Sequence, residues 1–363
     1  MKLAIIHDFL MTYGGAEKVT HQVHDLFPDA PIFTLRYDPE KIGHRFDDCD
    51  VRSSFIDKHS MLNRRGHTMA MPLYPMAIES FDLSEFDTVL SFSSAFAHGV
   101  ITQPGTRHIS YYHTPTRFLW DYHYQYLKEK GWDKGVKGAV AQRFLHNLRQ
   151  WDFLAAQRGD ELYANSGTVK DRVTKFYRRD SKVIYPGVEV DKYKIAEKVD
   201  DYYLTICRLT PPKRVELAIQ ACNELKRPLH IIGSGEDKER LQQMAGPTIK
   251  FMGFMTDEEV INQVEHCRAI LWPGIDDFGL VPVEGMAAGR PVVAFDKGGA
   301  TETVVHNQTG ILFQDQSTAG MIDGIKQLDK IESKLNPKAI KSHAEKFSLD
   351  EFNNNIRRIV EEK

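Results

Sequence analysis

The sequence of 363 residues has few cysteines and no long apolar run. Its four cysteines, Cys49, Cys207, Cys222 and Cys267, lie far apart and lack the spacing of metal ligands. They are typical of reduced residues in a cytosolic protein, which excludes a disulfide framework. No apolar stretch is long enough to span a bilayer, and the run over residues 2–6 is too short for a signal peptide. We therefore expect a cytoplasmic protein.

An excess of charge of either sign is also absent. The chain has 47 Lys and Arg residues and 50 Asp and Glu residues, which gives a net charge of −3. This balance lacks the basic surplus that nucleic-acid binding requires. The composition, 42% hydrophobic and 27% charged, is typical of a soluble globular protein. Because the length exceeds that of one ordinary core, we expect two domains.

A complete Gly-x-Gly-x-x-Gly motif is missing after the first predicted strand, residues 3–7. Its absence argues against an oxidoreductase that binds a dinucleotide. The chain instead has a short loop with the pair Gly14 and Gly15, followed by a predicted amphipathic helix. Two adjacent glycines let a ligand approach the backbone closely, although a plain tight turn fits the same pattern.

Short apolar runs alternate with amphipathic stretches, which predicts parallel sheets with helices on both faces. The predicted strands cover residues 3–7, 32–35, 88–93, 107–112, 162–166, 183–185, 202–207, 229–232, 249–252, 268–272 and 291–295. The alternation stops in polar residues after Pro186 and then restarts. We therefore predict an α/β fold with two Rossmann-like doubly wound domains, 1–186 and 187–345, facing each other across a cleft. A final helix over 346–363 is a candidate to cross back to the first domain.

The stretch over residues 273–291 lies between two of these strands and has room for one short helix over 280–288, stopped by Gly289. Asp276 and Asp277 then lie at the carboxyl end of a parallel strand, where open α/β sheets bind ligands. The free amides of a helix start suit an anion or a set of hydroxyls. Asp276 and Glu284 together suit a polyol, although a capping aspartate and a solvated Glu284 fit the spacing equally well.

Three further residues follow predicted strands. Arg208 and Lys213 lie in the loop after residues 202–207, where two cations at a helix start suit a diphosphate; a solvated pair beside a proline turn is the alternative. His113 follows residues 107–112, and we expect it to face the crevice, although a single histidine is more often structural than catalytic.

For two segments we favour a role in packing over a functional role. Residues 59–78 are rich in Met, Arg, Pro and aromatics, a mixture that suits a membrane surface or a lipid-linked substrate. We favour a packed helix there, with Met as filler. Apolar residues at helical spacing predict another packed helix, at Val140, Phe144, Leu148, Trp151 and Leu154.

Taken together, the motifs resemble those of a family 4 glycosyltransferase of the GT-B fold, over nearly the whole chain. The family's acid-x7-acid signature stands at Asp276 to Glu284 with Phe-Gly-Leu inside it, and Ala-x-Gly-x-Pro-Val-Val follows at 287–293. Arg-Leu-x-Pro-x-Lys at 208–213 and Gly-x-Gly at 233–235 complete the second half. Residues 7–18 and 112–121 are similar to bacterial mannosyltransferases that build O-antigen and related surface polysaccharides.

The resemblance implies a retaining, metal-independent transfer of a hexose from a nucleotide sugar, with no other cofactor. The residues it implies as catalytic are His113, Arg208, Lys213, Asp276 and Glu284. The residues it implies as donor-binding are Gly14, Gly15, Arg208, Lys213, Gly233, Gly235, Phe254, Asp277, Phe278, Gly279, Leu280, Val281 and Glu284. Arg208 and Lys213 would hold the diphosphate, and Glu284 would accept hydrogen bonds from the ribose.

One departure concerns the first acid, which is Asp276 where the family has Glu, with Asp277 in place of the following Gly. An Asp after the first acid occurs in the mannosyltransferase branch, which favours GDP-mannose over a UDP-sugar as donor. The implied acceptor is a glycan or a lipid-linked glycan, with peripheral contact at the inner face of the membrane. A UDP-sugar transferase of the same fold, or a non-catalytic partner in polysaccharide assembly, remains as an alternative.

Overall fold

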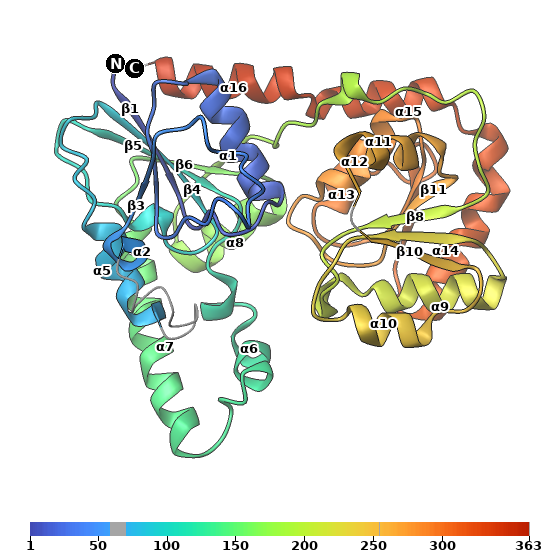
Figure 1. Cartoon of the computed structure of the whole chain (residues 1–363), viewed down its shortest axis with the longest axis horizontal. Helices are drawn as coiled ribbons and strands as arrows, with labels where there is room; N and C mark the ends of the chain where they lie inside the picture. Colours follow the sequence, from blue (N-terminus) through green and yellow to red (C-terminus); the bar gives the residue numbers. More distant parts are fainter. Residues whose placement is uncertain (59–69, 254, 363) are drawn as a thin grey trace. The chain divides into compact units, whose positions relative to one another are not determined.

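The computed structural model describes residues 1–58, 70–253 and 255–362, and the chain divides into two compact units (Figure 1). The first unit comprises Met1–Tyr185 with Asn353–Lys363, and the second comprises Pro186–Phe352. Each unit has one parallel sheet with helices on both faces. The predicted α/β class with two Rossmann-like doubly wound domains is confirmed.

The sheet of the first unit has seven parallel strands in the order β3-β2-β1-β4-β5-β6-β7. Their bounds are Leu3–His7 (β1), Ile32–Thr34 (β2), Val51–Ser53 (β3), Thr88–Ser93 (β4), Arg107–Tyr112 (β5), Glu161–Ala164 (β6) and Lys182–Val183 (β7). The strand order reverses between β1 and β4, so the loops after these strands diverge and leave a crevice at the carboxyl edge.

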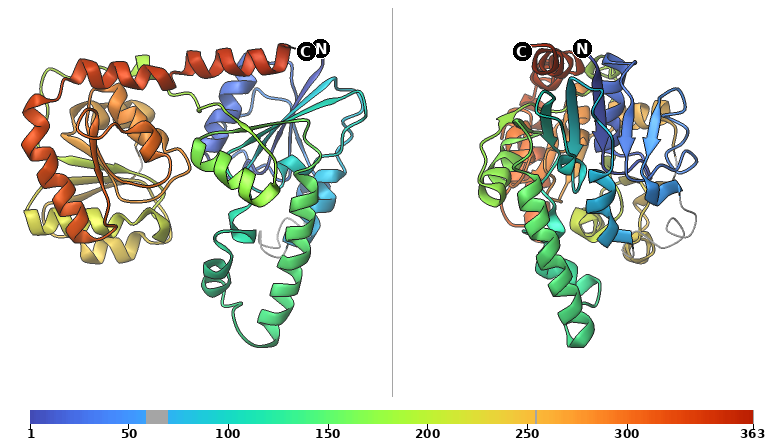
Figure 2. Two further views of the ribbon diagram at one scale, coloured as in Figure 1. Left: turned by 180° about the vertical axis from the view of Figure 1, so that it is seen from behind. Right: turned by 90° about the vertical axis from the view of Figure 1, so that its left-hand side faces the viewer.

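Helices cover both faces of this sheet, and one of them extends beyond it. The helices are Gly15–Leu26 (α1), Phe55–Lys58 (α2), Tyr74–Glu79 (α5), His123–Glu129 (α6), Gly135–Ala155 (α7) and Gly167–Tyr177 (α8), with short 3-10 turns at Met71–Leu73 (η1), Ala97–Gly99 (η2) and Arg117–Leu119 (η3). Figure 2 shows the start of α7 projecting away from the sheet. Val140 and Leu154 on α7 are 65% and 62% exposed, so the predicted packing of these two residues is wrong.

The sheet of the second unit has six parallel strands in the order β10-β9-β8-β11-β12-β13. Their bounds are Tyr203–Ile206 (β8), Leu229–Ile232 (β9), Ile249–Gly253 (β10), Ala269–Trp272 (β11), Val292–Phe295 (β12) and Gly310–Phe313 (β13). This order repeats that of the first six strands of the first unit. Here the crevice lies between β8 and β11.

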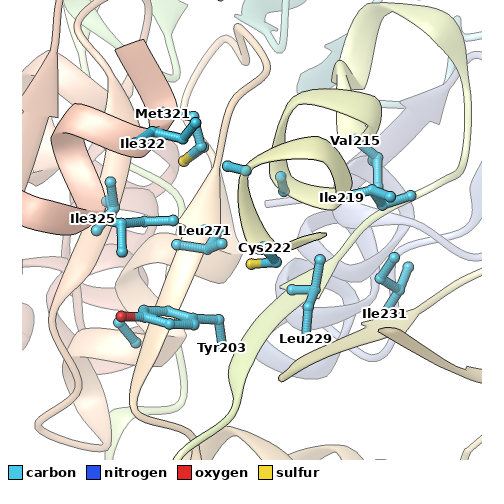
Figure 3. Close-up of a cluster of buried hydrophobic side chains, with 14 of the residues drawn as sticks. Tyr203, Val215, Ile219, Cys222, Leu229, Ile231, Leu271, Met321, Ile322 and Ile325 are labelled. Atoms are coloured by element: carbon cyan, nitrogen blue, oxygen red, sulfur yellow. The ribbon is translucent and has the colours of Figure 1, made fainter. Parts of the chain in front are cut away.

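The core of the second unit lies between this sheet and the helices α9 (Val215–Leu225) and α14 (Thr318–Ile331) (Figure 3). Tyr203 and Leu271 from the sheet face Ile219 and Ile325 from the helices, and all four are buried. The buried thiol of Cys222 packs among them as a small apolar group. The remaining helices are Lys238–Met244 (α10), Asp257–His266 (α11), Leu280–Ala287 (α12), Ala300–Thr303 (α13) and Pro337–Ala344 (α15), with 3-10 turns at Val190–Lys192 (η4), Pro211–Lys213 (η5), Glu332–Lys334 (η6) and Glu345–Phe347 (η7).

The last helix, α16, covers Leu349–Glu361. Its start lies beside residue 188, where Val188 pairs with Ser348 in an isolated parallel bridge. Its end belongs to the first unit, where Arg107 Nη1 donates a hydrogen bond to the carbonyl of Glu362 over 2.8 Å. Among the described helices, none is long and apolar enough to cross a membrane.

The predicted strands are confirmed except for their ends, and two strands were missed. β3 has the sequence Val-Arg-Ser and shows no apolar run, whereas β13 has the short apolar run Ile-Leu-Phe after Gly310. The predicted helix over 280–288 is α12, and Gly289 follows it with a φ of +71°. Of the segment 59–78, residues 59–69 lie outside the described part. The rest is helical and buries Met71, Tyr74 and Ile78.

Candidate functional site

In the second unit, Lys213 and Asp276 meet at the point where the strand order reverses. Lys213 ends η5 in the loop after β8, and Asp276 lies in the loop after β11. The Lys213 ammonium forms an ion pair with Asp276 Oδ1 and lies 5.5 Å from the centroid of the Trp272 ring. The two side chains are 26% and 18% exposed, so solvent and ligands can still reach the pair.

Asp276 Oδ2 is buried and has no hydrogen-bond partner among the residues that the structure describes. A carboxylate has two oxygens that accept hydrogen bonds, and burying one of them without a donor is unfavourable. Asp276 therefore has an unused acceptor beside a lysine, in a position where a ligand hydroxyl could donate to it.

The helix α12 begins directly after this loop. Its N-cap position is held by Gly279, which has a φ of +86° and no side chain to cap the first amides. Leu280 and Val281 open the helix, so their amides lie at the same edge of the sheet as Asp276. Helix starts of this kind favour an anion or hydroxyl oxygens.

Glu284 lies one turn into α12 and is partly buried. Burial raises the pKa of Tyr193, and the charge of Glu284 raises it further. Arg208 follows β8 and is exposed.

The loop after β9 packs tightly against the loop after β8. A Cβ atom at Gly233, whose φ is +139°, would lie 1.9 Å from the carbonyl oxygen of Cys207. Leu209 N also donates a hydrogen bond to Ser234 O over 2.9 Å. Only glycine allows the two loops to approach each other this closely. Packing alone therefore explains a glycine at position 233, whether or not it contacts a donor. Phe254, also predicted to bind the donor, lies outside the described residues.

In the first unit, His7 and Glu17 lie beside the predicted glycine loop. His7 Nδ1 is 2.8 Å from Thr20 Oγ1, and His7 Nε2 is 3.6 Å from Glu17 Oε1. Glu17 Oε2 accepts a hydrogen bond from Gly14 N over 2.9 Å, which fixes the loop at the start of α1. Burial raises the pKa of Glu17, but the hydrogen bond and charge of His7 outweigh it and lower the pKa below its ordinary value.

His113 is buried beside this group, and its ring centroid is 6.4 Å from that of His7. Burial and, to a smaller extent, the nearby His7 lower the pKa of His113 to about 3, against the opposing charge of Glu17. The imidazole is therefore neutral at pH 7. Its Nε2 atom is buried and lacks a hydrogen-bond partner within residues 1–58, 70–253 and 255–362. A neutral ring with an unused nitrogen suits a hydrogen bond to an uncharged hydroxyl.

Asp8 fixes the loop after β4, and sequence reasoning missed it. Its carboxylate accepts four hydrogen bonds from consecutive backbone amides, those of Ser94, Ala95, Phe96 and Ala97. Glu17 was missed as well, although Glu three residues after Gly14 is the spacing of a capping box. Asp8 has no comparable signal in the sequence, because its partners lie far along the chain.

The predicted site residues thus fall into two groups. Gly14, Gly15 and His113 belong to the first unit, and the others belong to the second. Within the second unit the structure brings Lys213 and Asp276 into direct contact and places Asp277, Phe278 and the start of α12 in the same loop. Among the described residues, no three His, Cys, Asp or Glu side chains gather in a way that could hold a metal ion.

Comparison with known proteins finds a family model that matches part of this chain. Residues 189–347 match the family model for glycosyl transferases group 1. The match covers nearly all of the second unit, including the loops with Lys213, Asp276 and Glu284.

Relatives and solved structures extend the likeness. The chain is 24% identical over 248 residues to alpha-1,3/1,6-mannosyltransferase ALG2 of Mus musculus, covering 55% of this chain and 58% of that protein. It is 28% identical over 175 residues to a GDP-mannose-dependent phosphatidylinositol monomannoside mannosyltransferase of Mycobacterium tuberculosis, covering 39% and 45%. The chain thus spans about half the length of these curated relatives.

The fold itself matches a solved structure from end to end. The crystal structure of Anabaena Alr3699/HepE in complex with UDP has a TM-score of 0.74 and 18% identity, and the match covers 100% of both chains. At this identity the likeness shows the fold alone, which is the GT-B fold with its two Rossmann-like units.

Proposed function

We propose that this protein is a glycosyltransferase that takes a hexose from a nucleotide sugar, with GDP-mannose as the donor. The observation that carries the proposal is the pairing of Lys213 with Asp276 at the β8/β11 crevice, beside the open helix start of α12. A cation, an acid with a free oxygen and free amides are the groups that a sugar diphosphate needs. The family match of residues 189–347 supports it.

The diphosphate binds at Lys213 and Arg208. When it arrives, the Lys213 ammonium exchanges Asp276 for a phosphate oxygen, since a doubly charged diphosphate attracts the cation more strongly than one carboxylate does. The two cations then stabilise the negative charge that grows on the departing phosphate, and this electrostatic effect is usually the largest in such reactions.

The exchange frees Asp276 to accept hydrogen bonds from sugar hydroxyls through both of its oxygens. The amides of Gly279, Leu280 and Val281 donate to the same sugar. Glu284, one turn into α12, accepts hydrogen bonds from the ribose hydroxyls. Gly233, Gly235, Asp277 and Phe278 complete the donor pocket.

The first unit supplies the acceptor side of the reaction. Gly14 and Gly15 let the phosphates approach the loop, and His113 donates or accepts a hydrogen bond at a hydroxyl of the donor sugar. The acceptor hydroxyl attacks the anomeric carbon on the face that the nucleotide leaves, the carbon–oxygen bond to phosphate breaks, and the departing phosphate oxygen takes the acceptor's proton. The configuration at the anomeric carbon is retained, and the acceptor is a glycan or a lipid-linked glycan.

Two kinds of relative bear on the donor. The names of the two mannosyltransferases, one of them dependent on GDP-mannose, support mannose. The solved complex of Anabaena Alr3699/HepE with UDP supports a UDP-sugar as the second candidate.

Calorimetric titration with GDP, GDP-mannose, UDP and UDP-glucose distinguishes these two candidate donors. We expect binding of GDP and GDP-mannose, with dissociation constants that rise in a Lys213→Ala variant. Binding of UDP with no heat for GDP would move the donor to the UDP-sugars. No heat with any of the four would favour a non-catalytic partner in polysaccharide assembly and contradict the proposal.

A further inference from the structure

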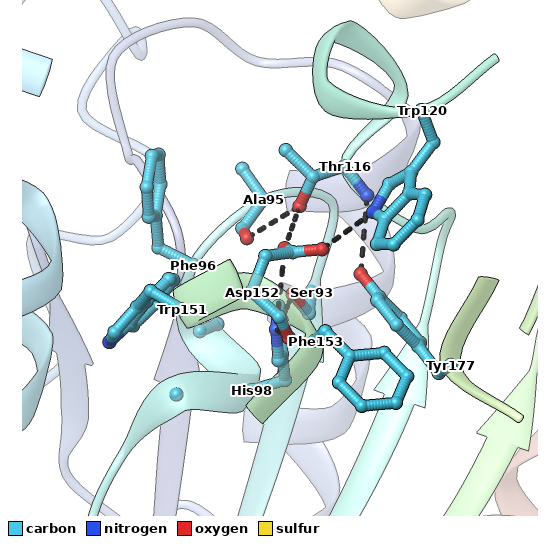
Figure 4. A network of polar contacts seen from close by, with 12 residues as sticks. Ser93, Ala95, Phe96, His98, Thr116, Trp120, Trp151, Asp152, Phe153 and Tyr177 are labelled. Carbon is cyan, nitrogen blue, oxygen red and sulfur yellow. Dashed lines mark hydrogen bonds and ion pairs between the residues drawn. The ribbon is translucent and has the colours of Figure 1, made fainter. Parts of the chain in front are cut away.

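A buried polar cluster in the first unit lies beneath the loop that begins with His113 (Figure 4). Its centre is Asp152 on α7, whose side chain is 0% exposed. Asp152 Oδ1 lies 2.5 Å from Thr116 Oγ1, and Asp152 Oδ2 lies 2.7 Å from Trp120 Nε1. Thr116 and Trp120 both belong to the segment 113–120, so one carboxyl group ties α7 to this segment at two points.

The hydrogens available to this cluster can be counted. Thr116 Oγ1 lies 2.8 Å from the carbonyl oxygen of Ala95 as well as 2.5 Å from Asp152 Oδ1. A hydroxyl has one hydrogen to donate and two lone pairs to accept. If Asp152 is ionised, two acceptors compete for that hydrogen. If Asp152 carries a proton, it donates to Thr116 Oγ1, Thr116 donates to Ala95 O, and both contacts are satisfied.

The charges around Asp152 favour the same conclusion. His98 is a basic residue close to Asp152, with Nε2 3.6 Å from Asp152 Oδ1 and 3.4 Å from the Asp152 carbonyl oxygen. Burial lowers the pKa of His98 to about 3, so it is neutral, and its Nδ1 is 2.9 Å from Ser93 Oγ. Arg158, whose charge reaches His98, pairs with Glu79 over 2.7 Å.

Arg149, one turn before Asp152 on α7, lies 5.9 Å from the centroid of the Trp120 ring and donates to the carbonyl of Leu119, so among the described residues no cation is in hydrogen-bond contact with the Asp152 carboxyl. Burial raises the pKa of Tyr112 on β5 and of Tyr177 on α8 well above 10, so both phenols are neutral. Asp8 raises the pKa of Asp152 by its charge. A buried carboxylate with no cation beside it is costly, and it takes up a proton instead.

The pKa of Asp152 agrees with this count. Burial raises it to about 7, even though hydrogen bonds from Thr116, Trp120 and Tyr177 lower it. In the unfolded chain the pKa of an aspartate is about 3.9. The folded protein therefore holds this proton over a range of pH in which the unfolded chain releases it.

We infer that the protonated form of Asp152 is the functional one and that its carboxylic acid positions segment 113–120, and with it His113. Asp152 is a positioning residue, since it contacts Thr116 and Trp120 and not the reacting groups. The effect on His113 rests on the proposed function; the protonation of Asp152 does not.

The inference sets the sign of a stability change with pH. Because the folded-state pKa is raised, the stabilisation by Asp152 is complete below about pH 4 and is lost as the pH rises through about 7. Asp152→Asn is the matched variant, because its amide NH₂ donates to Thr116 and its amide oxygen accepts from Trp120. Asn has no proton to lose, so it imitates the acid at every pH.

The first experiment measures the unfolding temperature of the full chain at pH 5 and pH 9 for the wild type, Asp152→Asn and Asp152→Ala. We expect Asp152→Asn to gain at least about 4 °C relative to the wild type on going from pH 5 to pH 9. Asp152→Ala should be less stable than Asp152→Asn at both values, because it loses both hydrogen bonds. If Asp152→Asn is as unstable as Asp152→Ala at pH 5, or keeps the pH dependence of the wild type, the inference is wrong.

The second experiment measures sugar transfer from the donor that calorimetry identifies, between pH 6 and pH 9. We expect kcat of the wild type to fall at least threefold across this range and kcat of Asp152→Asn to stay within twofold, with the donor KM unchanged in both. A wild-type decline that survives in Asp152→Asn would overturn the positioning role. Absence of transfer by any variant, together with the expected unfolding temperatures, would contradict the proposed function and leave the protonation of Asp152 supported.

Discussion

In the second unit, the loops after β8 and β11 bring together charged groups that stay partly exposed, among them Lys213 and Asp276. In the first unit, the carboxyl ends of β1 and β5, the strands on either side of β4, bring together groups that are buried, namely His7, Asp8 and His113. Both sheets share the same strand order, with its reversal between the first and fourth strands. The two sheets therefore have similar backbones, but the side chains at their carboxyl edges differ: those of the second unit are charged and partly exposed, and those of the first unit are buried.

The difference shows how one topology supports two tasks. Partial exposure leaves the ion pair of Lys213 and Asp276 accessible to an incoming ligand, which suits the capture of an anionic donor. Burial makes His113 neutral and leaves its Nε2 unused, which suits the orientation of an uncharged hydroxyl. We expect variants in the second unit to act through charge and variants in the first unit to act through geometry.

The largest effect is expected for Lys213→Ala, which removes a cation from the donor side. Turnover should fall about 10²-fold or more, on the scale of removing one oxyanion donor, and Arg208→Ala should behave similarly. Initial rates with the identified donor measure this. Lys326→Ala is the control, because Lys326 is an exposed cation on α14 outside the site. Near-normal rates for both Lys213→Ala and Arg208→Ala would remove them from the diphosphate site.

A smaller effect is expected for His113→Ala. The loss of one hydrogen bond to the sugar should lower kcat about tenfold, with less change in donor affinity. His113→Asn should recover part of the rate, because its amide can still form a hydrogen bond. Since the imidazole is neutral from pH 5 to 9, replacing it by Asn should leave the shape of the pH profile unchanged. If donor affinity alone falls, His113 is a binding residue.

The smallest effect concerns stability in acid. Burial lowers the pKa values of His98, His108 and His113 to about 3, 4 and 3, respectively. Below pH 6.5 the unfolded chain therefore binds protons at these histidines that the folded first unit does not bind. The raised pKa values of Asp8 and Asp152 oppose this only in part. The first unit should therefore lose about 1 kcal/mol of stability per pH unit near pH 5.

Tryptophan emission can test this unit by unit. Trp120, Trp132 and Trp151 lie in the first unit, and Trp272 lies in the second. In a Trp272→Phe variant, emission reports the first unit alone, while circular dichroism reports the whole chain. On acidification, the emission change of the first unit should be complete at a higher pH than the circular-dichroism change of the whole chain. Coincident transitions would show that the units do not differ in acid stability.

Much of this structure was predictable from local patterns. The buried parallel strands β1 and β4 are rich in apolar residues, and their bounds were predicted without error. The motif around Asp276 and Glu284 was visible because its residues are close in sequence. β3 was missed because it has no apolar run and is held in the sheet by its pairing with β2. β13 was missed although Ile311 to Phe313 form a short apolar run.

The sequence by itself determined the two α/β units, their approximate boundary and the residue types at the strand ends, because these depend on short-range periodicity and spacing. Only the tertiary structure decided the partners of Lys213, Asp8 and Asp152, which lie 63, 86 to 89 and 32 to 36 positions away along the chain. The reason is physical: the charge state of a buried group depends on the donors, acceptors and charges around it in space, and folding alone brings these together.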